Sequence, residues 1–160
     1  MTQARIYQDL KADHDRHRKL FEALAQTSGD SEERRTGFEQ LRTELQAHAA
    51  AEEQSLYAPM LANPDLRDEA RHSVAEHKEI DDMLGDLVET DMSSPGWLVK
   101  FKGLRERYVH HIDEEEEEMF PAAAEGLTKR EEKAAAQTFE ERKPEEIEIA
   151  RDEMPGEARE

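Results

Sequence analysis

The sequence contains no cysteine, which removes several classes of site at once. Disulfide bonds, iron–sulfur clusters, thiol catalysis and zinc sites built on thiolates are all excluded. Hydrophobic residues are also few, at 36% of the 160 residues against 39% for charged residues. A chain of this length forms one domain, and this composition is typical of a small helical bundle with narrow apolar stripes.

Basic residues are scarce relative to acidic ones. The chain has 22 Lys and Arg against 40 Asp and Glu, for a net charge of −18. A surface of this charge repels nucleic acid and anionic membranes, so we exclude both as partners. The N-terminal residues contain no apolar signal core, and no later run is long enough to span a bilayer. We therefore expect a cytoplasmic protein, either a monomer or a weak homo-oligomer.

No segment alternates apolar and polar residues as a strand does, whereas several segments have helical spacing. Capping residues mark where helices begin, because Ser, Thr and Asp side chains accept hydrogen bonds from free backbone N–H groups. Ser31 and the pair Ser94-Pro95 are of this kind, and Thr128 with Glu131 forms a capping box. The predicted helices cover residues 3–27, 32–61, 66–90 and 95–125, followed by a short fifth helix after Thr128.

These elements predict an all-α protein built as an up-down-up-down four-helix bundle over residues 1–126. A short C-terminal helix is expected over 127–143. From Pro144 the chain is strongly acidic, so we expect residues 144–160 to form a disordered tail.

The bundle looks like one helical hairpin written twice, with a constant offset of 63 residues. The second and fourth helices share a His, a Glu four residues later, a second Glu, a large apolar residue and an aromatic residue. The matched residues are His48, Glu52, Glu53, Leu56 and Tyr57 in the first copy and His111, Glu115, Glu116, Met119 and Phe120 in the second.

The run of five glutamates at 114–118 indicates a buried cation. Successive helical residues lie about 100° apart, so at least one carboxylate must face the bundle interior. Glu115 shares the apolar stripe of Tyr108, His111 and Met119, which makes it the inward one. Because a buried carboxylate without a partner is very costly, and a His lies one turn earlier, we predict a metal ion beside it.

Four histidines, one per helix, fall at the same height in such a bundle, because each pair is equidistant from the turn that joins its helices. His14 and His48 flank residue 31, and His77 and His111 flank residue 94. Glu52 and Glu115 lie one turn away, roughly 6 Å along the axis. One histidine on an apolar stripe is more often structural, but four imidazoles and two carboxylates in one layer predict a metal site. Iron, manganese or zinc suits this donor set.

The sequence resembles the hemerythrin-like proteins with an HHE cation-binding domain. The resemblance covers residues 3 to about 126 and rests on four motifs: ADH, HAAAEEQSLYAP, AEHKEIDDML and HIDEEEEEMFP. It implies a four-helix bundle that holds two iron ions, bridged by an oxo or hydroxo group and by carboxylates. The ligands implied by the resemblance are His14, His48, Glu52, His77, His111 and Glu115.

Two positions depart from the pattern of the oxygen-carrying members of that family. Those members have a further His one turn before the ligand of the third helix, where this chain has Ser73. They also have an Asp ligand five residues after the His of the fourth helix, where this chain has Glu116. Both differences favour members whose roles are sensing, peroxide or nitric oxide handling, and iron binding.

Three further residues are candidates for additional ligands or for hydrogen-bond partners of ligands: His17, Glu53 and His72. His17 takes a position that Ile80 fills in the second hairpin, so it is a fifth ligand, a donor to a ligand or a packing residue. Glu53 is expected in solvent beside Glu52. His72 is expected on the surface unless a local bulge turns it inward. His110 is expected to be exposed or to contact a ligand, while Tyr57 and Trp97 are expected to be packing residues.

The functional prediction is a non-haem di-iron protein that binds dioxygen, peroxide or nitric oxide, with manganese or zinc as alternative metals. No residue resembles a dedicated nucleophile or general base, so any catalysis belongs to the metal ions. The alternative is an iron-binding or iron/oxygen-sensing module without turnover, and a third hypothesis is a structural bundle without metal.

Overall fold

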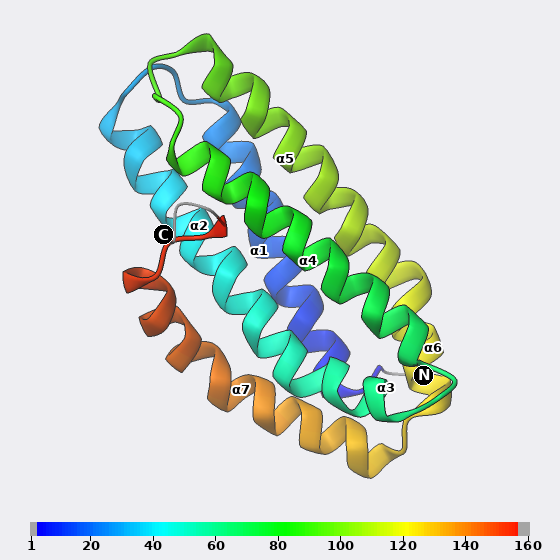
Figure 1. Ribbon diagram of the computed structural model, residues 1–160. Coiled ribbons are helices and arrows are strands. Elements are labelled where there is room, and N and C mark those ends of the chain that lie inside the picture. Colours follow the sequence, from blue (N-terminus) through cyan, green and yellow to red (C-terminus); the bar gives the residue numbers. More distant parts are fainter. Residues whose placement is uncertain (1–2, 157–160) are drawn as a thin grey trace.

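A computed structural model describes residues 3–156, and within them every regular element is a helix (Figure 1). Four long helical segments run up, down, up and down, with α1 packed on α2 and α5, and α4 packed on α5 and α2. This confirms the predicted bundle. The elements are α1 (Arg5–Ala25), α2 (Glu32–Glu52), η1 (Glu53–Tyr57), α3 (Ala58–Ala62), α4 (Arg67–Val88), α5 (Pro95–Glu114), η2 (Glu115–Met119), α6 (Phe120–Gly126) and α7 (Lys129–Asp152).

The helix starts follow the capping chemistry of the sequence. Ser31 accepts a hydrogen bond from the backbone of Arg34, and Ser94 accepts one from the backbone of Gly96. The capping box of Thr128 and Glu131 is complete at the start of α7. These contacts satisfy N–H groups that have no partner within their own helix.

The second and fourth bundle helices are not regular throughout, which differs from the continuous helices expected over 32–61 and 95–125. Each contains one turn of π-helix, η1 after α2 and η2 after α5. Both π-turns begin at the glutamate pairs that the two hairpins share, Glu52 with Glu53 and Glu115 with Glu116. A π-turn holds an extra residue, so it shifts the faces on which the following side chains lie, and such turns are frequent at functional sites.

Two apolar clusters fill the interior, one toward each end of the bundle. One cluster includes Leu10, Tyr57 and Phe120, and the other includes Phe21, Trp97 and Tyr108. The predicted histidine and glutamate residues belong to neither cluster. The apolar stripes are narrow, and none of the helices described in residues 3–156 is long and apolar enough to cross a membrane.

The C-terminal helix is longer than predicted, and residues 144–152 are helical instead of disordered. Helix α7 continues through Pro144 to Asp152 and packs along α2, α1 and η1 (Figure 1). Proline removes one backbone hydrogen bond, but tertiary contacts beyond it hold the helix. The buried Arg42 donates to the carbonyl of Ala150 at 2.9 Å, and Gln54 donates to Glu146 at 2.9 Å. Residues 157–160 of the predicted tail lie outside the described residues.

Candidate metal centre

The six residues predicted as ligands meet in one layer of the bundle interior. None of them exposes more than 7% of its surface. They come from four different elements plus the first residue of η2, as the repeat predicts. The six are His14 on α1, His48 and Glu52 on α2, His77 on α4, His111 on α5 and Glu115 on η2.

The layer divides into two sets of donors that share both carboxylates. In each set the ligand atoms lie within 4.8 Å of one another. The first set contains His14 and His48, the second contains His77 and His111, and each set also contains Glu52 and Glu115. Each set thus has two imidazoles of its own, and the two carboxylates lie between the sets. This arrangement of donors suits two adjacent cations.

The distances show how the carboxylates join the two sets. Glu52 Oε1 lies 3.5 Å from His48 Nε2 and 3.3 Å from His77 Nε2. Glu115 reaches both sets with different oxygens: Oε1 lies 3.3 Å from His14 Nε2, and Oε2 lies 3.3 Å from His111 Nε2. Every histidine therefore directs Nε2 toward a shared carboxylate.

The opposite ring nitrogen of each histidine is held by a carboxylate of its own. These Nδ1 contacts join His14 to Glu116 at 2.7 Å, His48 to Asp13 at 2.9 Å, His77 to Glu53 at 2.8 Å and His111 to Glu76 at 2.8 Å. The four pairs obey the 63-residue offset, so the site has the internal symmetry of the chain. A carboxylate on Nδ1 fixes the ring and leaves Nε2 free to ligate a metal, as in many metalloproteins.

Several polar atoms in this layer lack a partner. Among the described residues, His14 Nε2, His48 Nε2, Glu52 Oε2 and Glu115 Oε1 are buried without a hydrogen bond. Buried polar atoms are almost always paired, because leaving one unpaired costs on the order of 1–3 kcal/mol. These atoms converge on the shared carboxylates, so a cation there would satisfy them together. The residues present therefore fit a metal pair.

The carboxylates of the site stabilise positive charge on the neighbouring histidine rings. Burial by itself lowers the pKa of His48 and of His111, but the neighbouring carboxylates outweigh it. Glu52 and Asp13 raise the pKa of His48 to about 9, while Glu115 and Glu76 raise the pKa of His111 to about 10. The same anionic surroundings that hold protons on these rings would attract a metal cation, which binds by displacing them.

Comparisons with known proteins agree with this geometry. The family model of the Hemerythrin HHE cation binding domain matches residues 5–123. The chain belongs to this hemerythrin HHE family. An uncharacterized protein of Mycobacterium tuberculosis, Rv2633c, and one of Mycobacterium bovis, Mb2666c, are each 32% identical over 111 residues, which cover 67% of this chain and 67% of each relative.

A solved structure also resembles this hemerythrin-like chain. It is the crystal structure of a hemerythrin HHE cation binding domain-containing protein from Mycobacterium kansasii, a homolog of Rv2633c. The match has a TM-score of 0.80 at 27% identity, and it covers 93% of this chain and 90% of that chain. Because coverage is so high, the similarity extends beyond the four-helix bundle.

Within this hemerythrin-like site, Tyr57 has a role that sequence reasoning missed when it treated the residue as packing. Its hydroxyl lies 3.0 Å from Glu52 and also within hydrogen-bond distance of Glu115, so its one proton can be donated to either shared carboxylate. The matched residue of the second hairpin is Phe120, which has no hydroxyl. A Tyr opposite a Phe at matched positions was the available signal, because a buried hydroxyl needs a partner.

His17 lies beside the site but outside both four-residue sets. Its Nδ1 is 2.7 Å from the Tyr108 hydroxyl, and its Nε2 is 3.1 Å from Glu44. Burial lowers the pKa of His17 to about 3, against the raising effect of Glu44. Its ring also meets His48 edge-on, with centroids 5.1 Å apart. Both ring nitrogens already have partners, and neither Tyr108 nor Glu44 is a predicted ligand, so this geometry disfavours both a fifth ligand and a direct donor to a ligand.

The remaining candidates occupy three different places. Glu53 is partly exposed but holds Nδ1 of His77, so it is more than a solvated neighbour of Glu52. His72 has a side chain 59% exposed, and it lies on the surface near Glu76 and Glu114 without a bulge turning it inward. His110 is exposed and pairs with Glu114.

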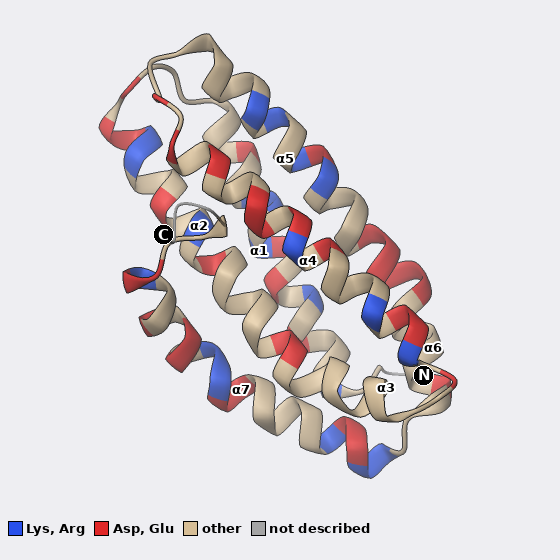
Figure 2. Cartoon of the chain, viewed as in Figure 1, with Lys and Arg blue, Asp and Glu red and all other residues tan. Residues whose placement is uncertain are grey.

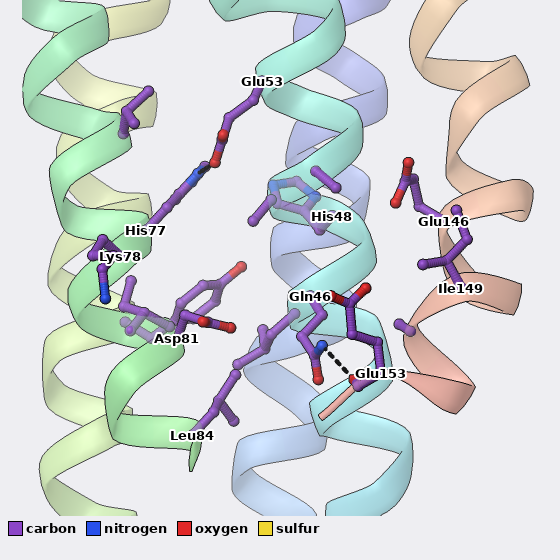
Figure 3. A pocket seen from close by; sticks show the side chains of 17 residues that line it. Gln46, His48, Glu53, His77, Lys78, Asp81, Leu84, Glu146, Ile149 and Glu153 are labelled. Carbon is purple, nitrogen blue, oxygen red and sulfur yellow. Dashed lines mark hydrogen bonds and ion pairs between the residues drawn. The ribbon is translucent and has the colours of Figure 1, made fainter. Parts of the chain in front are cut away.

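A cavity of about 350 Å³ opens beside the metal centre, between α2, α4 and the C-terminal half of α7 (Figure 3). His48 and His77 both line it, so it touches one histidine of each set. Most of its other wall is apolar, with Leu45, Val74 and Ile80 among the lining residues. Figure 3 shows Glu146 and Ile149 of α7 on the side facing α2. The cavity therefore borders both donor sets.

Proposed function

We propose that this chain holds two iron ions, one in each donor set, and binds dioxygen, peroxide or nitric oxide there. The observation that carries the proposal is the convergence of unpartnered buried nitrogen and oxygen atoms on two shared carboxylates. Iron is favoured over zinc because sets of imidazole and carboxylate with open positions are typical of oxygen-reactive iron.

The protein contributes positioning and exclusion of water. The bound metal ions would supply the redox chemistry and the positions for small ligands. The Nδ1 carboxylates hold the four imidazoles in place, and Tyr57 holds the two shared glutamates. The apolar clusters shield the layer from bulk water toward both ends of the bundle. No other group in the described residues stands out as a nucleophile or general base at the centre.

The cavity beside His48 and His77 supports a small, weakly polar ligand. Its volume of about 350 Å³ admits a diatomic molecule or peroxide, and the carboxylates of Glu53, Asp81, Glu146 and Glu153 on its wall disfavour anions. The side chain at the position of the carriers' additional histidine is Ser73, whose hydroxyl lies 3.8 Å from Met119 Sδ and outside both donor sets. One metal thus has fewer protein ligands than in a carrier, which favours reaction of peroxide over reversible release of oxygen.

The test compares three small molecules on one preparation. Iron-loaded protein is reduced without oxygen and then exposed to nitric oxide, air or hydrogen peroxide while its absorbance is followed. We expect a spectral change with nitric oxide, consumption of peroxide, and oxidation in air that vacuum does not reverse. Ser73→His, which introduces the residue of the carriers, should slow the oxidation in air. A colour that appears in air and disappears repeatedly under vacuum would instead identify an oxygen carrier.

The burial of the whole donor set supports an alternative, an iron-sensing module whose fold depends on its metal. Six polar side chains packed at 7% exposure or less need a cation for their stability. Under this alternative the loaded protein oxidises in air but consumes no peroxide and shows no response to nitric oxide. Loss of iron would then change its melting temperature by many degrees.

A further inference from the structure

A second cavity, of about 260 Å³, lies on the other side of the metal centre between α4 and the α5–η2 segment. Its inner residues include His111 and Glu115, which belong to the metal centre. Its outer residues are mainly acidic, and no Lys or Arg is among the residues that line it. Figure 2 shows acidic residues, in red, gathered along the helix where α5 approaches α6. The carboxylates that line this acidic cleft are Asp68, Glu69, Glu76, Glu114, Glu115 and Glu118.

The internal repeat shows that the acidic cleft is only partly matched in the first hairpin. Four of its residues match positions that are apolar or neutral and buried there: Glu69 matches Ile6, Ser73 matches Leu10, Glu114 matches Ala51 and Glu118 matches Ser55. Three others match charged positions, because His72 matches Asp9, Glu76 matches Asp13 and Asp68 matches Arg5. In the first hairpin α7 covers this side and its Lys143 pairs with Asp13, whereas no Lys or Arg lines the cleft of the second hairpin.

Three residues at the mouth of the cleft have the donor types and spacing of a cation site. His72, Glu76 and Glu114 offer ligand atoms within 4.8 Å of one another. His72 Nε2 lies 3.5 Å from Glu76 Oε2 and 3.7 Å from Glu114 Oε1, which is too long for good hydrogen bonds. A cation between the three would bring them into contact.

Glu76 links this mouth to the metal centre. Its Oε1 accepts a hydrogen bond from His111 Nδ1 at 2.8 Å, while its Oε2 faces His72. Arg107 also approaches Oε2 at 3.0 Å, so it balances one charge of the cluster but lies outside the cavity lining. Other acids of the cleft repel one another. Burial and the negative charge of Glu118 together raise the pKa of Glu69.

The inner end of the cleft reaches the metal centre. His111 and Glu115 line it and are each 2% exposed, and His111 Nε2 lies 3.3 Å from Glu115 Oε2. The unpaired Oε1 of Glu115 faces His14 Nε2 at 3.3 Å, and His14 lies outside the cavity lining. A cation that entered along the carboxylates would thus meet His111 and Glu115 first. The larger cavity beside α7 also has carboxylates on its wall, from Glu53, Asp81, Glu146 and Glu153, but Lys78 lies among them.

We propose that the acidic cleft is the route by which divalent metal ions reach the metal centre, and that His72, Glu76 and Glu114 form a capture site at its mouth. The inference rests on the proposed function, because it requires a metal-binding centre at the inner end. Rows of carboxylates beside low-dielectric walls raise the local concentration of cations and their association rates.

The first test measures how fast cobalt(II) enters the full-length protein after its metal has been removed, by stopped-flow absorbance at low ionic strength. The cleft variant combines Glu69→Gln, Glu114→Gln and Glu118→Gln. The control combines Glu22→Gln, Glu89→Gln and Glu141→Gln, which removes the same charge from exposed positions that line neither cavity. We expect the cleft variant to load on the order of tenfold more slowly, with the two tight equivalents still bound at the end, and the control to load like the parent.

The second test looks for the capture site itself. Equilibrium titration with cobalt(II) should show two tight equivalents and a third, weaker one, and His72→Ala should remove only the third. Equal loading rates of the cleft and control variants, or a third equivalent that survives in His72→Ala, would overturn the proposal. Failure of the proposed function is separate, since the parent would then bind no tight cobalt at all.

Discussion

Glu116 accepts a hydrogen bond from His14 Nδ1 at 2.7 Å, which ties η2 to α1 across the bundle. Its repeat partner Glu53 does the same for His77 at 2.8 Å. At each π-turn one glutamate, Glu52 at the end of α2 or Glu115 at the start of η2, faces the metal centre, and the next glutamate contacts a histidine of a different helix. Glu116 therefore contacts the predicted ligand His14 and lies outside both donor sets, although it matches the Asp that ligates iron in the oxygen carriers.

Glu116→Gln should weaken metal binding without abolishing it. The amide still accepts a hydrogen bond from His14, but it lacks the negative charge that makes the imidazole a stronger ligand. Partners of this kind typically contribute about 10- to 100-fold in metal affinity. The measurement is a competition titration against a metal chelator. Glu117→Gln, an exposed neighbour on the same π-turn, is the control and should bind like the parent. Equal affinities for the two variants would mean that Glu116 has no influence on the centre.

Tyr57→Phe should alter the metal spectrum while preserving the fold. The variant removes the hydroxyl that joins Glu52 and Glu115 but keeps the ring, as Phe120 already does in the second hairpin. Hydrogen bonds to charged groups contribute about 1.5–3 kcal/mol, so a loss of stability in that range is expected. Tyr7→Phe is the matched control, because the Tyr7 hydroxyl bonds to Glu132. An unchanged spectrum in Tyr57→Phe would return this residue to a packing role.

His17→Leu should keep both metal ions and lose stability. The ring nitrogens of His17 are engaged by Tyr108 and Glu44, so its removal leaves a buried hydroxyl unpaired at a cost of about 1–3 kcal/mol. Elemental analysis and urea denaturation of the same sample measure the two effects. His14→Leu is the comparison and should lose metal. Loss of a metal equivalent in His17→Leu would make it a ligand after all.

Asp9→Asn should remove a pH dependence of stability. Burial and the neighbouring Glu140 raise the pKa of Asp9 to about 7, above its usual value near 3.8. The folded protein therefore holds this proton more tightly than the unfolded chain, and this contribution to stability is lost as pH rises from about 4 to 7. Urea denaturation should show Asp9→Asn gaining stability relative to the parent between pH 5 and pH 8. A difference that does not vary with pH would contradict the shifted pKa.

The position of the metal centre along the bundle axis could be predicted from the sequence. The number of residues between a histidine and its turn, multiplied by the rise per residue, gives that position. His14 and His48 are equally far from their turn, and so are His77 and His111, so the bundle leaves them no other arrangement. The carboxylates behind the imidazoles were harder to predict. Asp13 and Glu76 match at the repeat offset, but only the packed structure shows which histidine each one reaches.

Other features depend on contacts between distant residues. A regular spacing of 3.6 residues per turn does not predict the two π-turns, because one extra residue in a turn leaves the apolar stripe intact on both sides. The helix beyond Pro144 was missed for a similar reason. Its composition is that of a disordered tail, and it is held by Arg42 and Gln54 from α2 and η1, more than 90 residues earlier in the chain.

The central claim is that two donor sets share Glu52 and Glu115, and the metal content of three proteins tests it most directly. Each is loaded with iron(II) without oxygen, passed through a desalting column and analysed for iron per chain. The parent should hold two equivalents, His14→Ala should hold about one, and Glu115→Ala, which removes a ligand from both sets, should hold fewer than His14→Ala. A parent that holds one iron or none, or a Glu115→Ala variant that still holds two, would contradict the account.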